Sequence, residues 1–104
     1  MLSHVVIFSW KTGTTKRQIE AVGHALDRIA NLNDDVLDLR HGPDARLRNG
    51  NGDYALVATF ADEAAWRRYQ ADPSHLSLVH ELITPIRLRA VSIQFAFDQA
   101  DQDH

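Results

Sequence analysis

The sequence predicts a single α+β domain in which one antiparallel sheet is covered by helices. Three observations lead to this prediction. Runs rich in β-branched and aromatic residues alternate with helical patterns in the order strand, helix, strand, strand, broken helix, strand. The chain has 104 residues, of which 44% are hydrophobic, which is enough for one core. It contains no cysteine, so neither disulfides nor thiolate metal sites can stabilise it.

The first predicted strand covers residues 2–10 (LSHVVIFSW) and carries apolar side chains on both faces. Successive side chains of a strand point to opposite sides of the sheet. One face therefore holds Leu2, His4, Val6, Phe8 and Trp10, and the other holds Ser3, Val5, Ile7 and Ser9. Because both faces are apolar at the centre, we expect this strand to be covered on both sides.

A helix follows the turn at Gly13. Thr15 and Gln18 have the spacing of a capping box, which marks a helix start. The helix is predicted to run to about residue 31, with one apolar face formed by Ile19, Val22, Leu26 and Ile29.

Two more strands come next. Residues 36–41 (VLDLRH) alternate only weakly between apolar and polar side chains, as is typical of a strand at a sheet edge. The polar segment 42–52 is a connection rich in turn residues, and residues 54–60 (YALVATF) have a strong β composition.

The segment from residue 62 to residue 85 predicts a helix that breaks and starts again. Asp62 is a good N-cap, and Trp66 and Tyr69 follow on one helical face. Pro73 ends this helix, and Ser74 is predicted to cap the next one. The second helix has an apolar stripe made of His75, Leu78, Val79 and Leu82. Pro85 should end it by making Thr84 extended.

The last strand is predicted over residues 86–97, and residues 98–104 form a polar tail. Arg87 and Arg89 are expected to share one strand face with Val91, Ile93, Phe95 and Phe97. The order βαββαβ is that of a ferredoxin-like fold with a four-stranded antiparallel sheet. Its helices would cover one sheet face and leave the other apolar face bare, so we predict a homodimer through the sheet face.

Composition disfavours several classes of function. The net charge is -3 and no basic stripe is present, which argues against nucleic-acid binding. No apolar run is long enough to cross a membrane. The N-terminus lacks the pattern of a signal peptide, so we expect a cytoplasmic protein. The six histidines have no recognisable ligand spacing, and we expect neither a metal nor a cofactor.

The sequence over residues 1–97 resembles the stress-responsive dimeric A/B barrel (Dabb) family. The resemblance rests on SHVVIFSW, on GDYALVATF followed by ADEAAWRRY, on DPSH and on VSIQFAF. It implies a ferredoxin-like protomer that forms a dimeric α+β barrel with a second copy. Some members of the family are linked to stress tolerance. Another branch, the olivetolic acid cyclase-type enzymes, closes a linear polyketide, and its similarity to this chain is more distant.

The resemblance to the cyclases implies catalytic residues. Tyr69 and His75 look like the cyclase's tyrosine and histidine, and His4 like its first-strand histidine. In an aldol-type closure, His75 would be the base and Tyr69 would stabilise the oxyanion. Ala55 and Leu26 stand where the cyclase has a histidine and a tyrosine, so the same reaction on the same substrate is not expected.

Three functions therefore fit the sequence. The first is a small-molecule lyase-like or polyketide-cyclase-like protein with catalytic residues His75 and Tyr69. Its pocket for an apolar or polyketide-like ligand would be lined by His4, Trp66, Leu26 and Leu78. The second is a cofactor-free monooxygenase, by analogy of fold. The third is a non-enzymatic stress-response or assembly module, in which His75 and Tyr69 are core residues that bond to the backbone, to His4 or to water.

Overall fold

The computed structural model describes residues 1–98, so the predicted polar tail lies outside the described residues except for Asp98. The elements follow the predicted order: β1 (Leu2–Trp10), α1 (Lys16–Leu32), β2 (Asp38–Pro43), β3 (Tyr54–Phe60), α2 (Glu63–Ala71), α3 (Pro73–Leu78), the π-helical turn η1 (Val79–Ile83) and β4 (Arg87–Ala96).

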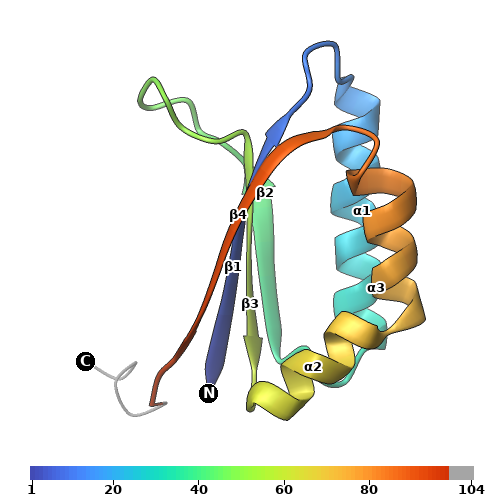
Figure 1. The fold of residues 1–104 in the computed structure, drawn as a ribbon, viewed down its shortest axis with the longest axis vertical. Coiled ribbons are helices and arrows are strands. Elements are labelled where there is room, and N and C mark those ends of the chain that lie inside the picture. The colour runs from blue at the N-terminus through green and yellow to red at the C-terminus, as the bar shows by residue number, and fades with distance from the viewer. Residues whose placement is uncertain (99–104) are drawn as a thin grey trace.

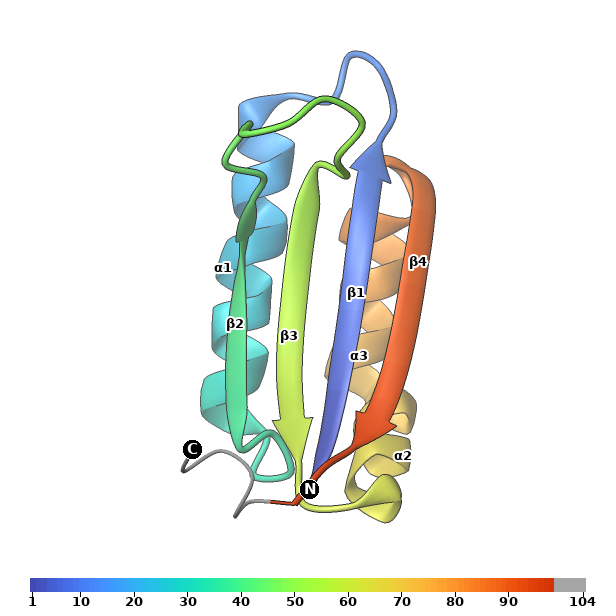
Figure 2. The ribbon, with the colours of Figure 1, turned by 90° about the vertical axis from the view of Figure 1, so that its left-hand side faces the viewer.

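Within residues 1–98, the strands form one antiparallel sheet in the order β2-β3-β1-β4. All the helices lie on the same side of this sheet (Figure 1), and the view onto the opposite side shows the strands with the helices behind them (Figure 2). The ferredoxin-like α+β fold predicted from the sequence is confirmed. No helix of the described chain is long and apolar enough to cross a membrane.

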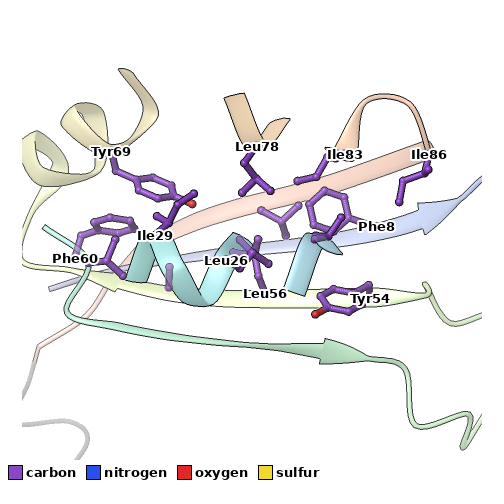
Figure 3. Packing of buried hydrophobic residues seen from close by; sticks show 14 of the residues in the cluster. Phe8, Leu26, Ile29, Tyr54, Leu56, Phe60, Tyr69, Leu78, Ile83 and Ile86 are labelled. Carbon is purple, nitrogen blue, oxygen red and sulfur yellow. The ribbon is translucent and has the colours of Figure 1, made fainter. Parts of the chain in front are cut away.

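The core lies between the sheet and the helices (Figure 3). β1 contributes Val6, Phe8 and Trp10, which are buried as the alternation predicts. On α1, Val22 and Leu26 are fully buried and face the sheet. This helix starts at the predicted capping box, because Gln18 N donates to Thr15 Oγ1 over 3.2 Å and Thr15 N donates to Gln18 Oε1 over 2.8 Å.

β2 lies two residues later than the prediction of residues 36–41. Val36 is a buried residue of the turn before the strand, and its N–H bonds to the carbonyl of Asn33. The strand extends to Pro43, which pairs with Tyr54 on β3. A proline is tolerated there because an edge strand need not donate a hydrogen bond on its outer side.

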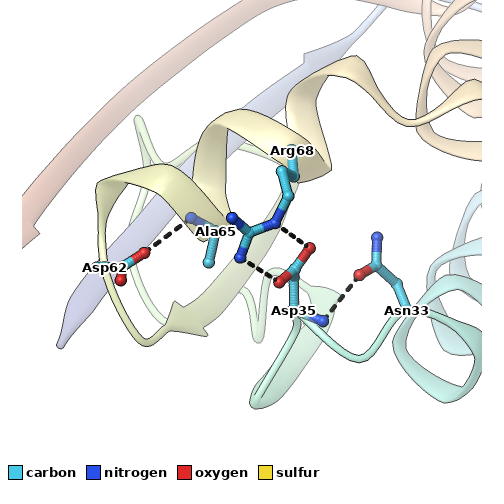
Figure 4. A network of polar contacts seen from close by, with 5 residues as sticks. All are labelled: Asn33, Asp35, Asp62, Ala65 and Arg68. Atoms are coloured by element: carbon cyan, nitrogen blue, oxygen red, sulfur yellow. Dashed lines mark hydrogen bonds and ion pairs between the residues drawn. The ribbon is translucent and has the colours of Figure 1, made fainter.

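A bidentate ion pair ties α2 to the turn before β2 (Figure 4). Arg68 Nε and Nη2 donate to the two carboxylate oxygens of Asp35 over 3.0 and 2.8 Å. The Asp35 backbone N–H donates in turn to the Asn33 side chain. Asp62 caps α2 by accepting from Ala65 N over 2.9 Å, as predicted. The ion pair therefore joins the second half of α2 to the turn before β2, and the cap of Asp62 starts the helix shortly after β3 ends.

The prediction that Arg87 and Arg89 share a face is wrong. Arg89 pairs with Ser9, but Arg87 pairs with Trp10, so Leu88 is an extra residue in β4. Such a β-bulge reverses the alternation. Arg87 therefore shares the helix-facing side with Ala90, while Arg89 is on the open side with Val91.

The open side of the sheet carries a group of exposed apolar side chains, which we call the open apolar face. Its most exposed members lie on β1 and β4: Ile7, Val91, Ile93 and Phe95 are 45, 50, 59 and 48% exposed. The register places Ile7 opposite Val91 and Val5 opposite Ile93, so these side chains are contiguous. No part of the described chain covers them.

Candidate active site

The break between α2 and α3 brings two ring side chains together. Asp72 has an extended backbone conformation and caps α3, because its Oδ1 accepts from Ser74 N over 2.8 Å and from His75 N over 3.4 Å. The predicted cap, Ser74, is therefore wrong: Pro73 occupies the first helical position, where proline is favoured, and the cap precedes it.

The end of this helical segment also differs from the prediction. Thr84 keeps a helical conformation with φ -52° and ψ -41°, although Pro85 follows it. Its N–H donates to the carbonyl of Val79, five residues earlier, over 2.8 Å. The chain turns toward β4 only after this point, where Ile86 N donates to the carbonyl of Ile83 over 3.0 Å.

Three predicted site residues converge from three different elements. Tyr69 from α2 and His75 from α3 have ring centroids 4.3 Å apart. The ring of His4 from β1 also lies near Tyr69, with ring centroids 6.3 Å apart. Figure 3 shows Tyr69 directed from α2 toward the sheet next to Phe60, whose ring lies 5.1 Å away. The site therefore depends on both the helix break and the register of β1.

His4 is buried and has two neighbours at one ring nitrogen. Trp66 Nε1 donates to His4 Nδ1 over 3.3 Å, and Gln94 Nε2 lies 2.9 Å from the same atom. Burial, and after it the proximity of His75, lowers the pKa of His4 to about 4. His4 is thus a neutral imidazole at physiological pH. It bonds to Trp66 and Gln94, and not to His75.

His75 keeps a free ring nitrogen. Its Nδ1 is buried and has no hydrogen-bond partner among residues 1–98. Burial lowers the pKa of His75, an effect opposed by the backbone carbonyl of Gln70 and the carboxylate of Asp72. A neutral imidazole with an unused nitrogen is a group that can accept a proton. An unsatisfied buried nitrogen is also costly, so its presence needs an explanation.

Tyr69 stays protonated across the physiological range. Burial, with a smaller effect of Asp72, raises the pKa of its phenol to about 12. The side chain is 1% exposed, and its ring packs between Phe60 and His75. Its hydroxyl is therefore a hydrogen-bond donor in a largely water-free setting, where such a donor stabilises negative charge most strongly.

A cavity of about 180 Å³ lies beside these residues. Five of the predicted site residues line it: His4, Leu26, Tyr69, His75 and Leu78. Trp66 does not line it and instead stands behind His4 as a hydrogen-bond donor. Exposed residues of β4 form one side of the cavity, so it opens beside that strand; these are Arg87, Ala90 and Ser92.

Sequence reasoning missed Gln94, Gln70, Arg87 and Ser92 as neighbours of the site. Gln94 pairs with His4 across the sheet, so its side chain points to the same face as the imidazole. The predicted strand alternation contained this signal, since Gln94 is a polar residue on the helix-facing side. Arg87 could not be found in this way, because the bulge at Leu88 reverses its face.

A second polar cluster lies at the opposite sheet edge. His41 Nδ1 is 2.7 Å from the Tyr54 hydroxyl, and His41 Nε2 is 2.6 Å from Asp27 Oδ1. Gly23 allows this approach, because a Cβ there would lie 3.0 Å from the Tyr54 hydroxyl oxygen. All three side chains are occupied with one another, so the cluster links α1 to the sheet. No group of three or more potential metal ligands occurs in the part of the chain that the structure describes.

The site combines a free base, a neutral hydroxyl donor and a neutral imidazole around a mostly apolar space. Such a set can move a proton at a carbon or oxygen atom and stabilise the oxygen charge that develops. It can do so with protein groups alone.

Solved structures with the same fold include proteins of unknown function and enzymes. A dimeric ferredoxin-like protein of unknown function from Thermobifida fusca YX is 31% identical, with a TM-score of 0.86 over 92% of this chain and 90% of that chain. The hydroxynitrile lyase from Passiflora edulis is 18% identical, with a TM-score of 0.83 over 94% of each chain. The cofactor-independent oxygenase SnoaB from Streptomyces nogalater is 17% identical, with a TM-score of 0.73 over 94% of this chain and 93% of that chain.

At their low identity, the two enzymes show a shared fold only. No curated protein matches the chain. The model of the Stress responsive A/B Barrel Domain, Dabb, matches residues 2–97. This chain therefore belongs to the stress-responsive A/B barrel (Dabb) family.

Proposed function

We propose that the protein is a cofactor-independent acid–base enzyme of the lyase or cyclase type, which breaks or forms a carbon–carbon bond next to a carbonyl group. His75 is the general base and Tyr69 the donor that stabilises the substrate oxygen. The observation that carries this proposal is the buried Nδ1 of His75, which lacks a partner within residues 1–98 and belongs to a ring that lines the cavity beside Tyr69.

The proposed cleavage step balances without a cofactor. His75 takes the proton of a substrate hydroxyl, the oxygen forms a carbonyl, and the adjacent carbon–carbon bond breaks. The released carbanion, a cyanide or an enolate, then receives the proton from His75. Tyr69 donates a hydrogen bond to the oxygen while it is negatively charged, and its raised pKa keeps the phenol protonated in this role. Run in reverse, the same steps form the bond.

The size and lining of the cavity favour a compact apolar substrate. An apolar cavity of about 150 Å³ holds one benzene molecule, and the cavity here has about 180 Å³. A cyanohydrin or β-hydroxy ketone with one small ring fits this space, whereas a long linear polyketide would extend out of it past β4. The fold shared with a hydroxynitrile lyase makes cyanohydrins the first substrates to test.

The test is turnover of mandelonitrile and of small β-hydroxy ketones, followed by the appearance of the carbonyl product. His75→Gln and Tyr69→Phe should each lower kcat at least a hundredfold while the protein stays folded. His80→Gln is the matched control, because His80 is an exposed histidine on the next turn. Equal turnover in His75→Gln and the wild type would refute the assignment of the base.

We also propose that the protein is a homodimer through the open apolar face. Apolar patches of this kind mark interfaces. The similar protein from Thermobifida fusca is described as dimeric, which supports the proposal. The same face supports a second candidate function, an assembly module for which association is the only activity. Absence of turnover together with a stable dimer would favour that candidate.

A further inference from the structure

Two N–H groups meet at a single nitrogen of His4. Trp66 Nε1 lies 3.3 Å from His4 Nδ1, and Gln94 Nε2 lies 2.9 Å from it. The indole comes from α2 and the amide from β4, so two different elements direct an N–H group at the same atom. His4 itself is only 6% exposed.

The indole decides which tautomer His4 adopts. An indole N–H can donate a hydrogen bond but cannot accept one. A proton on His4 Nδ1 would point at the indole hydrogen, so Nδ1 must be unprotonated and must accept. Gln94 can satisfy the same requirement by presenting its amide NH₂. A neutral imidazole has one proton, which must then be on Nε2.

We infer that Trp66 and Gln94 are positioning residues that hold His4 as the Nε2–H tautomer, so that His4 acts in the cavity as a hydrogen-bond donor and not as a base. This inference rests on the proposed function for its catalytic meaning. The tautomer itself is a property of the protein without substrate.

The assignment separates the tasks of the two histidines. His4 lines the cavity, and Nε2 is its only ring nitrogen not engaged by Trp66 and Gln94. His4 and Tyr69 therefore both carry a donor on a ring that lines the cavity, and the unpartnered Nδ1 of His75 belongs to a third ring of this lining. The proposed proton transfer needs one base and one donor at the substrate oxygen, and His4 would add a second donor there. The lowered pKa of His4 supports this arrangement, because a neutral ring carries one proton only.

The first experiment observes the ring nitrogens of His4 by ¹⁵N NMR at neutral pH without any substrate. We expect Nε2 to have the shift of a protonated nitrogen and Nδ1 that of an unprotonated one. In the double variant Trp66→Phe with Gln94→Leu, both donors are lost and the two shifts should move toward each other. In Trp66→Phe with Gln94→Glu, the indole donor is absent and the carboxylate can only accept, so Nδ1 should become protonated.

Trp10→Phe is the matched control, because the indole N–H of Trp10 has no hydrogen-bond partner within the described residues. The His4 shifts should not change in this variant. A protonated Nδ1 in the wild type, or unchanged shifts in the double variant, would overturn the inference. These results do not depend on turnover, so they remain informative if the proposed function fails.

The second experiment asks what His4 does in catalysis. A glutamine places an amide N–H near the position of the imidazole Nε2–H but cannot act as a base. His4→Gln should therefore keep turnover within about tenfold of the wild type, and adding Trp66→Phe to it should cause little further loss. In the wild-type background, the double variant Trp66→Phe with Gln94→Leu should lower kcat at least tenfold with KM nearly unchanged. Loss of all turnover in a folded His4→Gln protein would show that His4 is a base.

Discussion

The imidazole of His75 lies against the phenol ring of Tyr69, with centroids 4.3 Å apart, on opposite sides of the break between α2 and α3. They are six positions apart in the sequence, and a continuous helix would place them on different faces. Asp72 and Pro73 bend the chain so that both rings face the sheet. The geometry of this break therefore controls the distance between the proposed base and the proposed donor.

Removing the cap of α3 should change the site as well as the stability. We expect Asp72→Ala to lower the free energy of unfolding by about 1 kcal/mol, because two backbone N–H groups lose their acceptor. It should also lower the pKa of His75 further, since the carboxylate of Asp72 acts to raise that pKa. Chemical denaturation and an NMR titration of His75 measure the two effects. Asp62→Ala, which removes the cap of α2, should cost similar stability and leave the His75 titration as it was.

The stability of the protein should fall as the pH falls from 7 to 5. The pKa of His4 is about 4 in the folded state, against 6.5 for an exposed imidazole. Between these values the unfolded chain binds a proton that folded His4 does not, so unfolding is favoured as pH decreases. The expected loss is on the order of 2 kcal/mol, and the lowered pKa of His75 acts in the same direction.

Urea denaturation at several pH values tests this expectation. His4→Gln should reduce the pH dependence between 7 and 5, because the variant has no imidazole at this position. His24→Gln, which replaces an exposed histidine on α1, should keep the dependence of the wild type. A pH dependence that is the same in all three proteins would contradict the burial of a neutral His4.

The phenols of the native protein should resist ionisation in alkali. The chain has two tyrosines, and burial raises the pKa of both Tyr54 and Tyr69. For Tyr54 the charge of Asp27 adds to this effect. Phenolate absorbance at pH 10 should therefore be well below half of the value for the denatured chain. Normal titration of one phenol in the folded protein would mean that its hydroxyl is open to water.

A charge in the open apolar face should separate the proposed dimer. Ile93 is 59% exposed and lies opposite Val5, so Ile93→Asp places a carboxylate within the apolar patch. Sedimentation at micromolar concentration should give about twice the chain mass for the wild type and the mass of one chain for the variant. Leu32→Asp is the control, since Leu32 is 76% exposed at the end of α1, away from this face. A wild type that sediments as a monomer would refute the dimer.

The positions of helices and strands were predicted well where the spacing of apolar residues agrees with local signals such as helix caps and prolines. β1, β3 and the helix break at Pro73 lie where the pattern placed them, and the capping box of Thr15 and Gln18 is formed. The predicted convergence of Tyr69, His75 and His4 could be derived because each lies on the buried face of its own element. Alternation along β1 and helical spacing in α2 and α3 are enough for that.

The errors occurred where a specific hydrogen bond or strand pairing outweighs a local preference. Thr84 stays helical before Pro85 because a π-helical turn gives its N–H an acceptor at Val79, which no local rule includes. The bulge at Leu88 appears only when β4 is paired with β1. Trp66 was expected to line the cavity, but its N–H is directed at His4, and a helical face alone does not specify the target of a polar atom.

Beyond Arg87, the side of the cavity formed by β4 consists of small side chains. Ala90 lies opposite Phe8 and Ser92 opposite Val6, so two bulky residues of the inner strand stand next to two that extend no more than two atoms beyond Cα. A larger side chain at Ala90 or Ser92 would reduce the cavity from its β4 side. It would leave α2 and α3, with Tyr69 and His75, in place. The range of molecules that an A/B barrel of this type admits could therefore diverge through single exchanges in its outermost strand, while the acid–base groups stay the same.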